Sequence, residues 1–219
     1  MTEEARSIDE QTWALGMTPS EWGETYCSQG PGTNDCGPTN LAMILNAFTK
    51  EDWDKTKVHP RLRFPDFTDW LDKVIKFITR SKFNLEEVMG ATHPKGIADE
   101  FNRIAEERGI DRKAVRVSKG SKEDMLHEIR NGNPVTVVLI WGNGGAHYVT
   151  VISYNALTDT IFYMDPSDEY KDWDPPKRIQ SQAWGDFYED WSRRAWWAKL
   201  LTLKNEMVVI RERLDDRIC

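Results

Sequence analysis

The chain has 219 residues and a formal net charge of −7 at pH 7, with 39% hydrophobic and 30% charged residues. This length suits one medium-sized domain with a substantial core. The acidic balance argues against nucleic acid as a partner, and no apolar run approaches the roughly 18 residues of a membrane span. The N-terminal residues MTEEARSIDE lack the positive charge and apolar core of a signal peptide, so we expect a cytoplasmic protein.

Metal-ligating residue types are scattered along the chain. The three cysteines are Cys27, Cys36 and Cys219. They are too few for a disulfide framework and show no zinc-binding spacing, so we expect reduced thiols and no metal or organic cofactor. Three of the four histidines have no second ligand at metal spacing, and we interpret them as structural or exposed: His59, His93 and His127.

The N-terminal part is polar with scattered tryptophans. We interpret residues 1–24 as an N-terminal extension packed on a domain that spans residues 25–219, with a role in partner contact as the alternative. The segment 29–50 then opens with Gly, Pro, Thr and Asn, which interrupt regular structure, and closes into a helical pattern. One apolar face of that helix consists of Leu41, Ile44, Leu45 and Phe48.

The start of this helix places a thiol in a reactive setting. Asn34 and Asp35 are good N-cap residues, and Pro38 suits the first turn of a helix. Cys36 therefore falls at or just before the first turn. The free backbone N–H groups and the helix dipole there favour an anion, which promotes ionisation of the thiol.

The remaining elements predict an α+β fold, because helices come first and an antiparallel sheet follows. Apolar periodicity predicts helices over 68–81, over 94–108 with Gly109 as its stop, and over 122–132 with Ser121 as its cap. Alternating or branched segments predict strands over 114–118, 133–141, 146–154, 159–166 and 206–213. The aromatic stretch 187–204 is interpreted as a packed amphipathic helix, with a partner-binding or membrane-surface helix as the alternative.

His147 opens the strand 146–154 directly after a Gly-rich turn, and Asp165 ends the following strand. If the two strands form a hairpin, a turn near residues 156–158 sets His147 and Asp165 roughly opposite each other. Asp165 could then accept Nδ1–H of the imidazole and stabilise its charged form. Taken alone, each could equally be structural: a histidine hydrogen-bonded near a strand end, and an Asp-Pro turn.

Gln29 stands seven residues before Cys36. In a cysteine acyl-transfer site, a glutamine amide just upstream joins the cysteine N–H in binding the developing oxyanion. Without that context, Gln29 would be an ordinary surface residue.

The order of these residues (Gln, Cys at a helix start, His on a strand, Asp ending the next strand) is that of papain-like peptidases. The segments QGPGTNDCGPTNLAMIL and GNPVTVVLIWGNGGAHYVTVISYNALTDTIFYMDP resemble the C39 family of cysteine peptidases and its stand-alone C39-like relatives. The resemblance covers residues 25–192. It implies a papain-like fold with Cys36 as nucleophile, His147 as base and acid, Asp165 as its orienting residue and Gln29 as oxyanion donor.

Two features depart from the family pattern. Gln29 is one residue further from the cysteine than the usual six, with Pro31 and Gly32 in the gap. The chain also has no P-loop, so the family's link to ABC transporters and to Gly-Gly leader cleavage does not carry over.

The sequence therefore predicts a cysteine peptidase with a peptide or protein substrate. Two alternatives stay open: a catalytically inactive C39-like module that binds a peptide in the same cleft, and an acyltransferase that uses the same triad.

Overall fold

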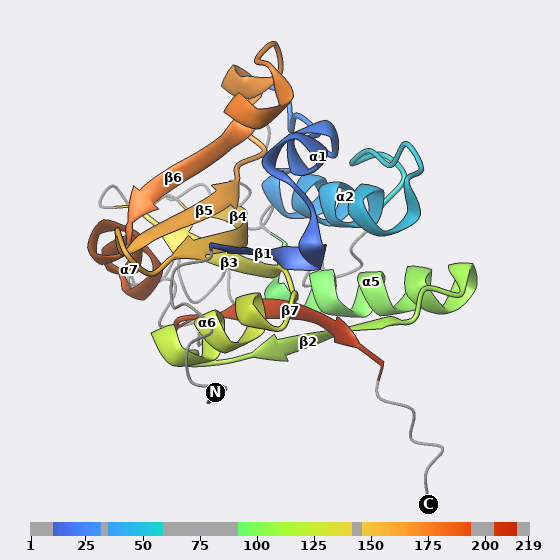
Figure 1. The fold of residues 1–219 in the computed structure, drawn as a ribbon. Helices are drawn as coiled ribbons and strands as arrows, with labels where there is room; N and C mark the ends of the chain where they lie inside the picture. Colours follow the sequence, from blue (N-terminus) through green and yellow to red (C-terminus); the bar gives the residue numbers. More distant parts are fainter. Residues whose placement is uncertain (1–10, 32–34, 59–91, 142–145, 194–203, 214–219) are drawn as a thin grey trace, which may run out of the picture.

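The computed structural model describes residues 11–31, 35–58, 92–141, 146–193 and 204–213. Within these ranges, helices cover a seven-stranded antiparallel sheet, which confirms the α+β class (Figure 1). The helices are α1 (Pro19–Glu24), α2 (Cys36–Thr49), α5 (Pro94–Arg108), α6 (Lys122–Arg130) and α7 (Trp184–Ser192). The strands are β1 (Thr12–Trp13), β2 (Arg112–Val117), β3 (Val135–Ile140), β4 (Ala146–Asn155), β5 (Thr160–Met164), β6 (Ile179–Ala183) and β7 (Met207–Glu212).

The strands follow the order β2-β7-β3-β4-β5-β6, and β1 adds to β4 beyond the end of β3. The last strand of the chain, β7, thus lies inside the sheet between β2 and β3. All six residues of β3 and the first four of β7 are buried. Such continuous apolar runs are typical of strands whose two faces are both covered.

Each face of the sheet has its own core because side chains alternate along a strand. On one face, residues such as Val138, Tyr148 and Val208 join the apolar sides of α2 and α5. On the other face, residues such as Val137 and Val149 join α6 and α7. Figure 1 shows α2 and α5 on a different side of the sheet from α7.

Helix α2 is buried almost all round, not on one face alone. The predicted face is present, because Leu41, Ile44 and Leu45 are fully buried in the first core. The opposite side is covered too, since Met43 packs in a third cluster with Trp22 of the N-terminal segment. No helix of the described residues is long and apolar enough to cross a membrane.

Most local predictions agree with the structure. Helix α5 ends at Gly109, which adopts a left-handed conformation with φ 65°, and a capping box at Ser121 starts α6. The five expected strands correspond to β2, β3, β4, β5 and β7. The predicted helix over 68–81 lies outside the described residues. Helix α7 begins at Trp184, three residues before the aromatic stretch 187–204, and covers the first part of that stretch, while residues 194–203 lie outside the described residues.

The sequence did not predict the elements of the N-terminal segment or the strand β6. Thr18 and Glu21 form a capping box that starts α1, and the indole Nε1–H of Trp22 donates to Ala14 O at 3.1 Å. Strand β1 pairs with β4. Residues 11–24 thus contribute to the sheet and core, while the proposed domain boundary after residue 24 stays a prediction.

Candidate active site

Cys36 is the first residue of α2, and Asp35 is its N-cap. The thiol is free and half-buried at the edge of the first core. A sulfur at this position faces the unpaired N–H groups and the positive end of the helix dipole. Asp35 does not cap the helix with its side chain, although the sequence favours that role. Its carboxylate instead forms an ion pair of 2.7 Å with Lys55.

His147 stands near the start of β4, with 7% of its surface exposed. Its Nε2 and Oδ1 of Asp165 form a hydrogen bond of 2.7 Å, and the same oxygen accepts from Ser167 N–H at 2.8 Å. The carboxylate therefore contacts Nε2 and not Nδ1, so the contact with Nδ1 expected from the sequence is wrong. Because Nε2 is hydrogen-bonded to the carboxylate, Nδ1 is the nitrogen that remains to interact with Cys36.

The hairpin register also differs from the expected one. Thr150 pairs with Met164, so the position opposite Asp165 is two residues away from His147. A β-bulge at Ile152 shifts the pairing by one residue between Val151 and Ser153. The two side chains therefore meet diagonally across the hairpin, and a simple turn at residues 156–158 does not describe the contact.

The electrostatics of His147 favour its charged form. Burial lowers the pKa of the imidazole, but hydrogen bonds to Asp165 and to the Cys36 sulfur, with the negative charge of both groups, outweigh burial and raise the pKa to about 9. His147 is thus held between an acid and a thiol.

Gln29 lies in the irregular segment before Cys36 and is held by hydrogen bonds of its main chain. Its N–H donates to Pro166 O at 2.9 Å, and its carbonyl oxygen accepts a hydrogen bond from Lys55 Nζ. The side-chain oxygen of Gln29 is buried. The chain thus brings Gln29 beside the residue that follows Asp165, which places it at the same end of the fold as the imidazole.

Two buried polar residues near the site were missed by the sequence analysis. Asn40 Nδ2 donates to Cys36 O and to Tyr148 O, both at 2.8 Å, and the hydroxyl of Thr150 donates to Asn40 Oδ1 at 2.8 Å. Both side chains are buried. Their signal in the sequence is a polar residue inside an apolar helix and another inside an apolar strand, since such residues need buried partners.

Trp141 directly follows β3, and its ring stacks on the imidazole of His147. The ring centroids are 5.4 Å apart at an interplanar angle of 20°, while 43% of the tryptophan surface stays exposed. The indole thus shields one face of His147 and leaves its own outer face toward solvent.

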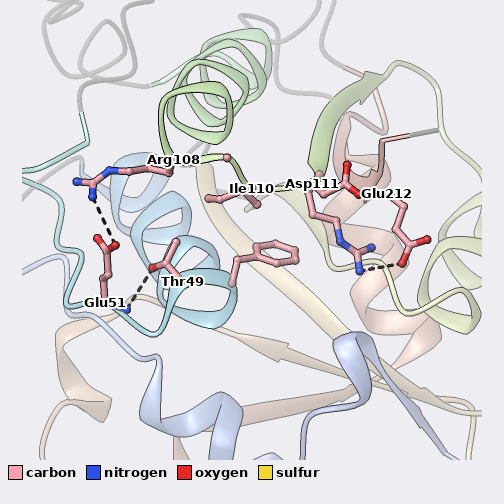
Figure 2. A pocket seen from close by; sticks show the side chains of 9 residues that line it. Thr49, Glu51, Arg108, Ile110, Asp111 and Glu212 are labelled. Atoms are coloured by element: carbon pink, nitrogen blue, oxygen red, sulfur yellow. Dashed lines mark hydrogen bonds and ion pairs between the residues drawn. The ribbon is translucent and has the colours of Figure 1, made fainter. Parts of the chain in front are cut away.

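An open pocket of about 560 Å³ lies away from these residues, at the C-terminal end of α2 (Figure 2). It lies between two ion pairs, Arg108–Glu51 at 3.5 Å and Arg112–Glu212 at 3.0 Å. Its lining includes no cysteine or histidine. The position of the candidate site therefore follows from the chemistry at Cys36 and His147, and not from the size of a pocket.

In the part of the chain that the structure describes, the other candidate ligands do not form a metal site. Among the described residues, no group of three His, Cys, Asp or Glu side chains could hold a metal ion. His93 caps α5, since its Nδ1 accepts from Lys95 N–H at 3.1 Å. His127 lies on α6 within 3.1 Å of Asn131 Nδ2. Both have the structural roles that the sequence indicated, while His59 lies outside the described residues.

An α+β fold with a cysteine at the start of a buried helix and a histidine–aspartate pair on the sheet defines the class of papain-like proteins. Residues 23–195 match the family model described as the Peptidase_C39 like family, so the chain belongs to this family. This match confirms the resemblance inferred from the sequence.

A solved structure has a similar fold. The chain is similar to a crystal structure described as that of a C39-like peptidase from Bacillus anthracis, with a TM-score of 0.55 and 15% identity over 94% of this chain and 99% of that one. A second similar structure is the peptidase domain of Streptococcus ComA, a bi-functional ABC transporter involved in quorum sensing. Its TM-score is 0.46, at 14% identity over 85% of this chain and 96% of that one. No curated protein matches the sequence.

Proposed function

We propose that the protein is a cysteine peptidase in which Cys36 is the nucleophile, His147 the general acid and base, Asp165 the residue that orients the imidazole and Gln29 an oxyanion donor. The observation that carries this proposal is the position of His147, which is hydrogen-bonded to Asp165 at 2.7 Å and whose pKa is raised by both Asp165 and Cys36. Membership of the Peptidase_C39 like family supports the same chemistry.

The reaction would proceed in two halves. In the first, the Cys36 thiolate attacks a peptide carbonyl, and Cys36 N–H and the Gln29 amide bind the negative charge that develops on the oxygen. The imidazolium of His147 then gives its proton to the leaving amine, and a thioester remains. In the second half, neutral His147 takes a proton from water, the resulting hydroxide attacks the thioester, and the acid product and the thiolate are released.

Asp165 contributes without touching the substrate. Its carboxylate stabilises the imidazolium and fixes the ring so that the other nitrogen is directed to the sulfur. Ser167 N–H holds the same carboxylate oxygen in turn.

We place this activity in the cytoplasm, because Cys27 and Cys36 are free thiols, which fits a reducing compartment.

The test is the pH dependence of iodoacetamide alkylation, located by mass spectrometry, in the wild type and in His147→Ala. We expect Cys36 to react at neutral pH and to lose most of this reactivity without His147. Cys27 is an internal control, since burial raises the pKa of this thiol to about 11 and should keep it unreactive. If Cys36 reacts no faster than Cys27, or at the same rate in both proteins, the proposal is wrong.

Hydrolysis is then sought with a peptide library, using Cys36→Ala as the inactive reference. Cleavage that disappears in this variant supports the peptidase. A product whose mass shows an added amine would indicate acyl transfer, and peptide binding that survives Cys36→Ala with no cleavage by the wild type would indicate a binding module.

A further inference from the structure

Lys55 joins the two ends of the segment that separates Gln29 from Cys36. It lies in the loop after α2, and its Nζ donates to the main-chain oxygen of Gln29 and to Oδ2 of Asp35, the latter at 2.7 Å. Asp35 is the N-cap of α2, directly before Cys36. One side chain therefore contacts both the residue proposed to bind the oxyanion and the start of the helix that bears the nucleophile.

We propose that Lys55 is a positioning residue that holds Gln29 against the start of α2, so that the amide of Gln29 and the N–H of Cys36 can act on the same oxyanion. This inference rests on the proposed function of Cys36 and Gln29. Lys55 itself does not contact the substrate in this proposal.

Several other hydrogen bonds of residues 28–30 lead to a different part of the fold. Gln29 N–H is bound to Pro166 O at 2.9 Å, and Ser28 Oγ donates to Asp168 Oδ1 at 2.6 Å while accepting from Gly30 N–H at 3.0 Å. These bonds fasten the segment to the residues after Asp165. Lys55 supplies a link in the other direction, to the nucleophile helix.

The behaviour of Asp35 supports this reading. An aspartate at an N-cap position usually accepts a hydrogen bond from a backbone N–H of the first turn. Here the carboxylate makes no such bond and is turned to Lys55, although the ion pair is partly exposed, at 27% for Lys55 and 44% for Asp35. An exposed ion pair contributes little to stability. Because Asp35 makes this ion pair and no capping hydrogen bond, we infer that the contact with Lys55 serves to position the start of α2.

The need for such a link follows from the spacing. Gln29 precedes Cys36 by seven residues, and two of the residues between them are glycines, so the sequence alone does not determine the distance between Gln29 and Cys36. Oxyanion donors act only at about 2.7–3.1 Å from the developing charge, and a misplacement of about 1 Å can cost up to about 100-fold in rate. A clamp across the ends of the stretch keeps the two donors in register.

Two reagents that react with the same sulfur separate positioning from ionisation. p-Nitrophenyl acetate acylates the Cys36 thiolate through a tetrahedral oxyanion and releases p-nitrophenolate. Iodoacetamide alkylates the same thiolate by displacement of iodide, and no oxyanion forms. A defect in the oxyanion site therefore slows the first reaction and spares the second.

We expect Lys55→Met to lower the acylation rate constant about 10- to 100-fold and to leave alkylation within about threefold of the wild type. Lys55→Arg should recover most of the acylation rate, because a guanidinium can donate to both oxygens. Lys57→Met is the matched control, since Lys57 lies in the same loop and its Nζ contacts only Asp52 and Asp54 among the described residues. It should leave both rates unchanged.

The charge of Asp35 needs a separate control, because Lys55→Met leaves that carboxylate unpaired near the thiolate. The effect of Lys55→Met is therefore also measured in a protein that already carries Asp35→Asn, in which the carboxylate is absent. Asparagine keeps a side-chain oxygen that can accept from Lys55 Nζ, so the hydrogen-bonded link survives in this background without the charge. The same selective loss of acylation is therefore expected between Asp35→Asn and the double variant. If acylation and alkylation fall together, or if the loss vanishes in the Asp35→Asn background, Lys55 acts through charge and the inference is wrong.

Amide hydrogen exchange of residues 30–36 gives a readout that needs no activity. Exchange in this stretch should become faster in Lys55→Met and stay at the wild-type rate in Lys57→Met. Unchanged exchange together with unchanged acylation would overturn the inference while leaving the proposed function intact. A wild-type Cys36 that reacts with neither reagent would overturn the proposed function, and the exchange rates would still decide whether Lys55 fixes the segment.

Discussion

The hydroxyl of Thr150 donates a hydrogen bond of 2.8 Å to the side-chain oxygen of Asn40, and neither residue is more than 1% exposed. Asn40 is one turn after Cys36 on α2, and Thr150 lies on β4, the strand that His147 opens. Because the Asn40 amide also donates to Cys36 O and Tyr148 O, this one side chain fastens the nucleophile helix to the histidine strand.

We predict that Asn40→Ala lowers the free energy of unfolding by about 2–4 kcal/mol, because it leaves the buried Thr150 hydroxyl without this acceptor and opens a void. Urea denaturation measures this change. Alkylation of Cys36 in the folded protein, without urea, should also slow, since the helix and the strand lose their common link.

Asn102→Ala is the matched control. Asn102 also bridges a helix and a strand, accepting from Ala114 N–H at 2.7 Å and donating to Ala114 O at 3.0 Å, but it joins α5 to β2. It should cost stability without slowing Cys36. An equal slowing of Cys36 in both variants would show that Asn40 has no particular role in aligning the site.

The parts of the fold that the sequence predicts are those with local signals. The end of α5 follows from Gly109 and the start of α6 from Ser121, because each residue acts within one helical turn. The meeting of His147 with Asp165 followed from the hairpin, since the two strands are neighbours in the sequence. The sequence did not predict the β-bulge at Ile152 or the contact of Asp165 with Nε2 of His147, because both depend on side-chain packing across the sheet.

Distant partners account for most of what was missed. Strand β1 has two residues and exists only through its pairing with β4, and β6 is polar and partly exposed, so neither carries an apolar pattern. Asn40 and Tyr148 are 108 residues apart in the sequence. A polar residue inside an apolar helix signals a buried partner, but the sequence does not say which strand supplies it.

The pKa of His147 leads to a second prediction. Burial lowers this pKa, but the hydrogen bonds and charges of Asp165 and Cys36 raise it to about 9, so His147 keeps its proton below that pH and loses it above. Hydrolysis should therefore fall as the pH rises through about 9, because the leaving amine needs the imidazolium proton. Alkylation by iodoacetamide needs only the thiolate and should show no such fall.

Asp165→Asn tests the cause of this alkaline limb. The variant removes the negative charge that favours the imidazolium, so the limb should move to lower pH in a plot of hydrolysis rate against pH. Asp174→Asn is the control, because Asp174 is paired with Lys177 at 2.7 Å on the surface and should leave the limb in place. A limb that does not move in Asp165→Asn would mean that Asp165 does not set the pKa of His147.

The stacking of Trp141 on His147 gives a third prediction, which needs no substrate. A protonated imidazole in contact with an indole quenches its fluorescence more strongly than a neutral one. Tryptophan emission should therefore rise as the pH passes through about 9, where His147 loses its proton. Trp141→Phe should abolish this step, while Trp173→Phe, with a tryptophan of similar exposure at 44%, should retain it. A step that persists in Trp141→Phe would assign the titration to another group.

The fourth prediction concerns the contact between α1 and the segment that follows Asp165. A Cβ added at Gly23 would lie 1.8 Å from the main-chain oxygen of Pro175, and Arg178 Nη1 donates to Gly23 O at 3.1 Å in the same contact. Because main-chain atoms cannot give way as a flexible side chain would, Gly23→Ala must push the two segments apart. We expect a loss of about 1–3 kcal/mol in the free energy of unfolding, measured in urea.

Gly185→Ala provides the comparison, since Gly185 lies in α7 and nothing stands within 4 Å of its added Cβ. There alanine should be neutral or should stabilise the protein by up to about 1 kcal/mol, because glycine is a poor helix former. Gly23→Ala should also slow hydrolysis, because the displaced segment includes two residues that bind the Gln29 segment. Pro166 O accepts from Gln29 N–H, and Asp168 Oδ1 accepts from Ser28 Oγ. Equal stability of the two variants would show that α1 and Pro175 are not in the close contact that positions this segment.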